Sequence, residues 1–388
     1  MPSNVNPNPL LQHFIVNAIN SMTPLKRPRI AVLEFVSGGG MSTHPLSEIP
    51  PSLLREGTAM LHALASDWAR LPDSDVSVCW DSRLGRCCIP GVSTVTIDAQ
   101  HSFLKVWNAI VRDVDFAIVI APEIDNQLVE LVEQLGRGNT KLINADIPFL
   151  RTASDKWLTA QSFYHANVSH PPTYLLHEVL ANNSLTEHFR DQYQRWTIKP
   201  RDGAGCDRIE LFSTFEDAMR AGNHMHAASV PTHEYILQPW LEGIAGSVVA
   251  LCGDGRFCVL PPMTQNIIAD NKPTNASKNE LLASSRMVRY AGGSGPWHAI
   301  PQADMNAFVA QVLAAIPGKP TGWIGIDFIA TDSSQRHDSL VAIEVNPRLT
   351  TSYLGLRKIV AENLASLMIQ ATIGKAVQYT RLEDFIEF

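Results

Sequence analysis

Apolar runs alternate with amphipathic stretches through the first third of the chain, and this alternation restricts the fold more than any other feature. The run at 29–36 is almost continuously apolar, as expected of a strand that is buried on both faces. Further strands are predicted at 75–80, 93–97, 115–120 and 141–144, and helices at 52–70, 102–112 and 125–136. Strands that alternate with helices predict a parallel sheet covered by helices on both faces.

A glycine-rich turn follows the first predicted strand, with the sequence Ser37-Gly38-Gly39-Gly40. Sheets of this kind bind ligands at the carboxyl ends of their strands. The spacing differs from the G-x-G-x-x-G pattern of dinucleotide sites, so dinucleotide binding is not expected. A simple tight loop and a substrate contact through Ser37, Gly38 and Gly39 are both compatible with the pattern.

A strand predicted at 196–199 ends on Lys199 and leads into a glycine loop, Gly203-Ala204-Gly205, before a strand returns at 208–212. Glycines let backbone amides approach phosphate oxygens closely, and the lysine adds a positive charge. The loop lacks Walker A spacing and no helix follows it, so a P-loop is excluded. A hairpin that folds over phosphates fits the pattern, and a plain glycine hairpin is the alternative.

A helix predicted at 154–166 has Ser154 as its candidate N-cap and Lys156 in its first turn. A lysine is unfavourable there because the amino end of a helix carries a partial positive charge. This conflict suggests that Lys156 acts outside the helix, for example on a phosphate. An ordinary surface lysine is the alternative.

The stretch 234–243 reads as a strand that runs into a link interrupted by Pro239. Such a strand edge offers backbone groups to an adenine ring, with Trp240 and Leu241 as apolar walls and Glu242 within reach of a ribose. Beyond it we expect a hairpin over 248–260, a loop over 270–281, and helices over 303–316 and 356–373. A glycine loop is expected over 292–296, either as a lid or as a plain connector.

Oxygen ligands gather near the carboxyl end of the chain. Strands predicted at 325–329 and 341–345 are joined by a polar link, which favours a hairpin. Side chains alternate along a strand, so Glu344 and Asn346 share a face, and Asp327 joins them if it lies on that face of the partner strand. A site with only a few oxygen ligands suits Mg²⁺, which takes its further contacts from water and phosphates. A solvated polar face is the alternative.

Composition excludes several classes of protein. A chain of 388 residues suggests two or three domains. The net charge of −7, without a block of basic residues, argues against nucleic acid or an anionic membrane as a partner. No apolar run approaches the roughly 20 residues of a membrane-spanning helix, and the first residues are expected to be an extension or loose arm rather than a signal peptide. The six cysteines lack zinc-type spacing, so reduced thiols in a cytoplasmic protein are expected.

The order of these elements resembles that of the ATP-grasp superfamily of carboxylate–amine ligases. The stretches 34–40, 199–206 and 344–353 look in particular like the tyramine–glutamate ligases of methanofuran biosynthesis and their bacterial relatives in methylofuran and one-carbon pathways. The resemblance implies an α/β, Rossmann-like N-terminal domain at 29–150 after an extension at 1–28. Two α+β lobes, at 151–240 and 241–388, would then grip ATP.

The resemblance also implies a reaction. The γ-phosphate of ATP passes to a carboxylate, and an amine attacks the resulting acylphosphate to give an amide, ADP and phosphate. A small-molecule acid and amine are therefore the expected partners, glutamate and tyramine first among them, and a homo-oligomer is compatible with the sequence. A peptide-forming or glutamate-chain-extending ligase is the alternative enzyme, and a non-catalytic ATP-binding module is the alternative outside enzymes.

Site residues carry over one by one from the resemblance. It matches Lys156 and Lys199 to two lysines that face the phosphates. It also implies that Arg348 faces the phosphoryl group that is transferred. The other matches are the mobile loop (Gly203 and Gly205, with Ala204 between them), the nucleotide link (Gln238 to Leu241) and the Mg²⁺ ligands (Asp327, Glu344, Asn346). A ribose contact by Glu242 and substrate contacts by Thr350, Thr351 and Ser352 are also expected. The chain departs from many members at Gln238-Pro239, where they have Glu-Lys, and no general base for the amine stands out among His44, His298 and Glu34.

Overall fold

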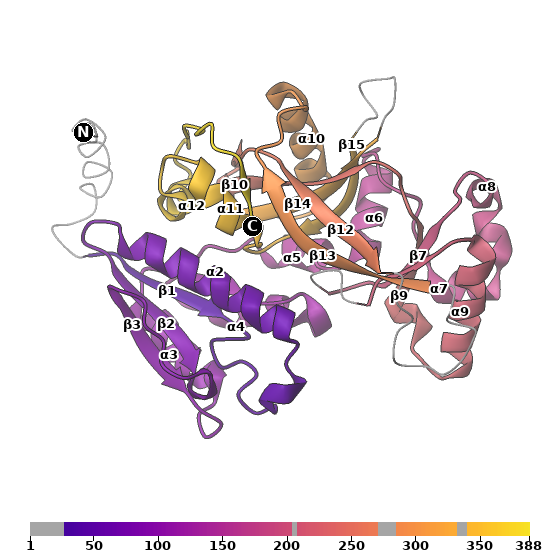
Figure 1. Cartoon of the computed structure of the whole chain (residues 1–388). Helices are drawn as coiled ribbons and strands as arrows, with labels where there is room; N and C mark the ends of the chain where they lie inside the picture. Colours follow the sequence, from indigo (N-terminus) through magenta and orange to yellow (C-terminus); the bar gives the residue numbers. More distant parts are fainter. Residues whose placement is uncertain (1–26, 204–207, 271–284, 332–339) are drawn as a thin grey trace.

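The computed structural model describes residues 27–203, 208–270, 285–331 and 340–388. An N-terminal α/β unit lies beside a larger unit built on an antiparallel sheet (Figure 1). The predicted extension at 1–28 and the predicted loop at 270–281 fall almost entirely outside the described residues.

The N-terminal sheet is parallel, with strand order β3-β2-β1-β4-β5. Its strands are β1 (Arg29–Glu34), β2 (Asp75–Asp81), β3 (Val92–Ile97), β4 (Phe116–Ile120) and β5 (Lys141–Leu142). Its helices are α2 (Pro51–Ala69), α3 (Phe103–Asp113) and α4 (Gln127–Leu135). Alternate residues of β1 pack into two different cores, one containing α2 and the other α3 and α4, so helices cover both faces. The predicted Rossmann-like fold is confirmed.

The larger sheet is antiparallel and runs in the order β15-β14-β10-β12-β13-β8-β7-β9-β6. Two strands lie outside this order: β11 pairs with β10, and β16 pairs with β13. The strands are β6 (Tyr174–Leu175), β7 (Trp196–Pro200), β8 (Glu210–Phe212), β9 (Tyr235–Pro239), β10 (Ile244–Gly253), β11 (Arg256–Val259), β12 (Met263–Asp270), β13 (Ser285–Gly295), β14 (Gly322–Ala330), β15 (Leu340–Asn346) and β16 (Ile386–Glu387).

Helices cover the two ends of this sheet separately. Around the β7–β9 end, a small core contains α7 (Leu176–Ala181) and α9 (Phe215–Ala227), with α8 (Glu187–Arg190) nearby. Around the β14–β15 end lie α5 (Ile147–Ala153), α6 (Lys156–His165), α10 (Gln302–Ala315), α11 (Ser352–Ile359) and α12 (Leu364–Thr372). The sheet therefore joins two lobes, as the predicted fold requires.

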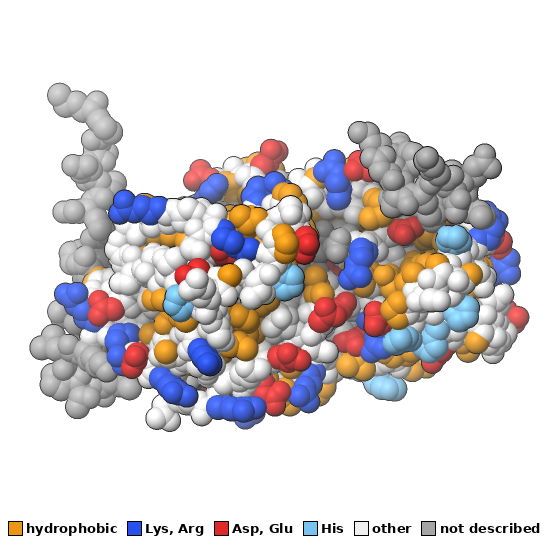
Figure 2. Space-filling view, turned by 90° about the horizontal axis from the view of Figure 1, so that it is seen from below, with side chains coloured by type: hydrophobic (Ala, Val, Ile, Leu, Met, Phe, Trp, Pro, Cys, Tyr) orange, Lys and Arg blue, Asp and Glu red, His pale blue; other side chains and the backbone are white. Residues whose placement is uncertain are grey.

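Short 3₁₀ turns complete the chain: η1 (Leu46–Glu48), η2 (Ser82–Leu84), η3 (Ile124–Asn126), η4 (Asn183–Thr186) and η5 (Thr232–Glu234). Within the described ranges, no helix has the length and apolar character needed to cross a membrane. On the face shown in Figure 2, basic and acidic side chains are interspersed.

Helix α2 attaches the N-terminal unit to the carboxyl-terminal helices. The Asp67 carboxylate accepts hydrogen bonds from Tyr353 Oη at 2.7 Å and from Arg357 Nε at 2.8 Å. The indole Nε1 of Trp68 donates to the carbonyl of Ala365 at 2.8 Å. These contacts fix α2 relative to the segment that follows β15.

Three local predictions are wrong. The expected helix at 356–373 is two helices, because the chain leaves the helical conformation at Val360 and Asn363 caps α12 by accepting from the Ser366 amide. The expected lid at 292–296 lies mostly inside β13, where Gly293 and Ser294 pair with β12. The N-cap of α6 is Asp155 and not Ser154, since the Asp155 carboxylate accepts from two amides of the first turn.

Candidate active site

A pocket opens between the two lobes and the N-terminal unit. Its walls come from strands β7, β9, β10, β12, β13, β14 and β15, from the segment after β15, and from α2. Most of the site residues expected from the sequence line it: Lys199, Gln238, Trp240, Leu241, Asp327, Glu344, Asn346, Arg348, Thr350, Thr351 and Ser352.

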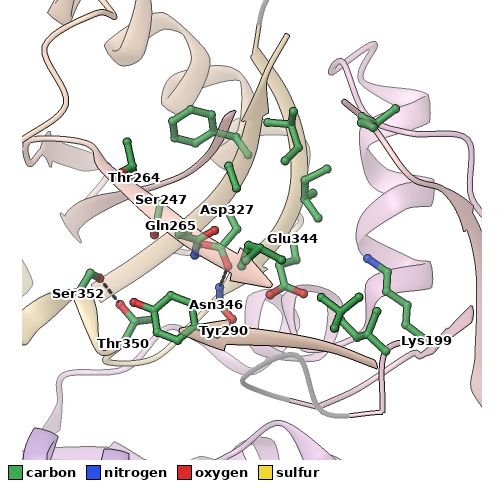
Figure 3. A pocket seen from close by; sticks show the side chains of 18 of the residues that line it. Lys199, Ser247, Thr264, Gln265, Tyr290, Asp327, Glu344, Asn346, Thr350 and Ser352 are labelled. Atoms are coloured by element: carbon green, nitrogen blue, oxygen red, sulfur yellow. Dashed lines mark hydrogen bonds between the residues drawn. The ribbon is translucent and has the colours of Figure 1, made fainter. Parts of the chain in front are cut away.

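The predicted hairpin of β14 and β15 is confirmed, and it brings the three oxygen ligands together. Asp327 is the direct cross-strand partner of Glu344. The Asn346 amide donates to Asp327 Oδ2 at 3.1 Å (Figure 3). The register shifts between Asp327 and Phe328, so two residues of β15 face one of β14. This bulge explains why Ile343 and Glu344 both line the pocket although they are neighbours in sequence.

The two carboxylates differ in their electrostatic surroundings. Burial and the nearby charge of Glu344 raise the pKa of Asp327 to about 7. Burial also disfavours ionised Glu344, but the charges of Lys156 and Lys199 outweigh it and hold the pKa of Glu344 below its ordinary value. The pair therefore favours a shared proton or an added cation between the two side chains.

Two lysines flank Glu344. Lys156 Nζ lies 3.5 Å from Glu344 Oε2 and donates to the carbonyl of Gly203 at 3.3 Å. Lys199 is buried on β7, and Glu344 lies between Lys199 and Asn346 in Figure 3. Lys199 lines the pocket, whereas Lys156 is not among the lining residues. Lysines fixed beside a carboxylate of the lining can neutralise a polyanionic ligand that enters the pocket.

Arg348 is held by the N-terminal unit. Its Nε donates to Glu123 Oε1 at 2.8 Å, and both side chains are largely buried. Glu123 stands at the N-cap of η3, beyond the end of β4, where ligand-binding residues of parallel sheets lie. Sequence reasoning missed Glu123 because no local pattern links it to a residue more than two hundred positions away.

The link that the sequence predicts for nucleotide binding lies only partly in the pocket. Gln238, Trp240 and Leu241 line it, and the Gln238 side chain donates to Thr173 Oγ1 at 2.6 Å. Glu242 does not line the pocket. Its exposed carboxylate accepts from Arg195 Nε at 3.1 Å, so the structure does not bring Glu242 to the site.

The Ser37-Gly38-Gly39 turn also lies away from the pocket lining. The Ser37 amide and hydroxyl donate to Glu34 Oε2 at 2.6 and 2.5 Å. A Cβ on Gly38 would stand 2.1 Å from the Glu34 carbonyl, and Gly39 has a φ of 91°. The geometry favours the tight-loop alternative. Of the expected phosphate loop, Gly203 is described, with its carbonyl on Lys156, whereas Ala204 and Gly205 lie outside the described residues.

Hydroxyl groups form one wall of the pocket. Thr350 Oγ1 and Ser352 Oγ are 2.6 Å apart, and Trp323 Nε1 donates to Thr350 at 3.0 Å.

Gln265 on β12, which sequence reasoning missed, donates to Asp327 Oδ1 at 3.0 Å. Other lining residues without a sequence signal are Glu56, Ser247, Thr264, Tyr290 and Phe388.

Comparison with known proteins identifies the class. A family model described as an ATP-grasp domain matches residues 153–352, just over half of the 388-residue chain, and a pre ATP-grasp domain matches residues 74–147. The chain therefore belongs to the ATP-grasp family. It is an ATP-binding ligase of that family, which agrees with the resemblance noted in the sequence.

One relative and two solved structures show how far the likeness extends. The tyramine–L-glutamate ligase of Methanocaldococcus fervens is 22% identical over 321 residues, 82% of this chain and 87% of that protein. An ATP-grasp superfamily protein of Archaeoglobus fulgidus is 18% identical, with a TM-score of 0.58 over 93% of this chain and 98% of that one. The ADP complex of N5-carboxyaminoimidazole synthetase of Staphylococcus aureus is 14% identical, with a TM-score of 0.63 over 93% of this chain and 82% of that one. At these identities the two structures are similar in fold.

Proposed function

We propose that this ligase joins a carboxylic acid to an amine through an acylphosphate, with L-glutamate and tyramine as its substrates. The observation that carries the proposal is one pocket that is lined both by the cations Lys199 and Arg348 and by Asp327, Glu344 and Asn346. The relative from Methanocaldococcus fervens, which is named for this substrate pair, supports the choice of acid and amine. A methylofuran-type pathway in the cytoplasm is part of the same proposal, as are domain boundaries near 150 and 240.

The proposed chemistry follows from the poor reactivity of a carboxylate. Its oxygen is a poor leaving group until the γ-phosphoryl group of ATP is transferred to it. The amine nitrogen then forms a bond to the acyl carbon and loses one proton, the bond from that carbon to the phosphate oxygen breaks, and phosphate leaves. Phosphoryl transfer depends mainly on positioning and charge neutralisation. We assign that neutralisation to Lys156, Lys199 and Arg348.

The carboxylate pair fits a divalent cation. Asp327 and Glu344 face each other, partly buried, and the raised pKa of Asp327 reflects the cost of two adjacent negative charges. Two carboxylates with the Asn346 oxygen form a hard, incomplete ligand set, as Mg²⁺ prefers beside phosphates. We propose that these three residues hold Mg²⁺, which when bound would neutralise charge on the phosphates of ATP.

An acid–amine assay tests the proposal. The protein is incubated with ATP, Mg²⁺, glutamate and tyramine, and phosphate release and amide formation are measured. Glu344→Ala should lower the rate by about 10²–10³, by analogy with the loss of one group that stabilises a transition state. The exposed Glu130 on α4 provides a control, and Glu130→Ala should keep the wild-type rate.

The substrates in this assay separate the alternatives. Replacing tyramine by amino acids or glutamyl peptides tests the peptide-forming ligase, which would turn over only with those amines. Nucleotide binding without phosphate release for any pair would reject the ligase mechanism and favour a non-catalytic ATP-binding module.

A further inference from the structure

Glu56 is a carboxylate that the N-terminal unit contributes to the pocket. It lies in the first half of α2 and lines the same cavity as Arg348 and Thr350. The neighbouring Gly57 is packed so closely against Glu34 that a Cβ there would stand 2.5 Å from the Glu34 carboxylate. Farther along α2, Asp67 is bonded to Tyr353. The helix that carries Glu56 is thus held at Gly57 and at Asp67, both of which follow Glu56 in the sequence.

The Glu56 carboxylate has no partner of its own. Within the described ranges it makes no hydrogen bond and no ion pair. The nearby guanidinium of Arg348 is hydrogen-bonded to Glu123 instead. Burial raises the pKa of Glu56, although the charges of Arg348 and Arg55 oppose this effect. Arg55 is exposed, so solvent and salt screen its charge. A partly buried carboxylate without a partner is stabilised by a cation.

The charges in and around the pocket form two groups. In one, Lys156 and Lys199 act on Glu344, which suits the phosphates of ATP. In the other, the carboxylates of Glu56 and Glu123 act on the single guanidinium of Arg348, on which Glu344 also acts. The excess of negative charge near Arg348 favours a positively charged ligand there.

We propose that Glu56 binds the ammonium group of the amine substrate before the amine is deprotonated for attack. A primary amine near the lysine reference pKa of about 10.4 arrives protonated at neutral pH, so a carboxylate is the group that recognises it. The same pocket is lined by Met263, Tyr290 and Phe388, which offer apolar surface to an aromatic body. This inference rests on the proposed ligase function, and it assigns amine recognition to the N-terminal unit.

Steady-state kinetics of Glu56→Gln test the inference. Hydrogen bonds to charged groups contribute about 1.5–3 kcal/mol, so the KM for tyramine should rise by roughly 10- to 100-fold. The KM values for ATP and glutamate should change less than about two-fold, because those ligands do not meet Glu56. Glu48→Gln, at an exposed glutamate in η1 shortly before α2, is the matched control and should keep all three values.

A neutral analogue separates a charge contact from a general loss of structure. Para-ethylphenol has the body of tyramine without the ammonium group, so it should inhibit the wild type and Glu56→Gln equally. An unchanged KM for tyramine in an active Glu56→Gln enzyme would overturn the inference. Weaker inhibition of the variant by para-ethylphenol would overturn it too, because the change would then not be specific for charge. Absence of glutamate- and tyramine-dependent turnover in the wild type would instead reject the proposed function.

Discussion

Asp327 and Glu344 show how two residues of the same type acquire different properties at one site. Glu344 lies between two lysines and ionises readily, whereas Asp327 accepts from the neutral amides of Asn346 and Gln265 and resists ionisation. The alternation of side chains along a strand predicted that Glu344 and Asn346 share a face. The proton balance between the carboxylates depends on Lys156 and Lys199, which come from other elements.

The raised pKa of Asp327 predicts a pH-dependent stability in the absence of metal. The folded protein holds this proton more tightly than the unfolded chain, whose carboxyl titrates near 3.8. The stabilisation is therefore complete below that pH and is lost as pH rises towards about 7. Glu344 does not reverse this trend above about pH 5, because its pKa is lowered and it stays ionised.

Asp327→Asn should thus flatten the decline in melting temperature between about pH 5 and 8, measured in the presence of a chelator. Addition of Mg²⁺ at pH 8 should raise the melting temperature of the wild type more than that of Asp327→Asn. Parallel profiles for the two proteins would show that Asp327 is not the titrating group.

At the scale of elements, α2 does the most to join the parts of the molecule. The sequence predicts this helix within one residue at each end from its apolar periodicity. Its attachment through Asp67 to Tyr353 and Arg357 has no sequence signal, since nearly three hundred residues separate the partners. The errors at 292–296 and 356–373 have a similar origin. The glycines at 292–296 lie in a strand because that strand pairs with β12. The expected helix at 356–373 is divided because Asn363 caps α12 and donates a hydrogen bond to the Asp67 carbonyl of α2.

Tyr353→Phe tests the attachment of α2 to α11. Tyr353 is buried and its hydroxyl donates to the buried carboxylate of Asp67, so its loss should lower the free energy of unfolding by about 1.5–3 kcal/mol. Urea denaturation followed by tryptophan fluorescence measures this change. Tyr164 is 68% exposed, and Tyr164→Phe should leave the free energy unchanged. Equal stability of the two variants would contradict the structural role given to this hydrogen bond.

In the whole molecule, the pocket draws residues from both lobes and from the N-terminal unit. A ligand that bridges them stabilises the folded state by an amount set by its concentration relative to its Kd, about 2.7 kcal/mol at one hundred times Kd. ATP with Mg²⁺ should therefore raise the melting temperature of the full chain.

Lys199→Met should reduce this thermal shift, since Lys199 is buried in the pocket and we assign it to the phosphates. Lys105→Met, at an exposed lysine of α3, is the matched control and should keep the wild-type shift. Differential scanning fluorimetry across a range of ATP concentrations measures both. A full shift in Lys199→Met would remove Lys199 from the nucleotide site.

The sequence by itself determined the features that depend on near neighbours: the alternating strands and helices of the N-terminal unit, the hairpin that carries Asp327 and Glu344, and the strand that ends near Lys199. Periodicity and turn residues encode these features within short windows. Only the tertiary structure decided that Glu56 and Gln265 line the pocket and that Glu123 holds Arg348, and that Glu242 and the Ser37 turn do not line the pocket. Such contacts join residues far apart in sequence, and they depend on how whole elements pack against one another.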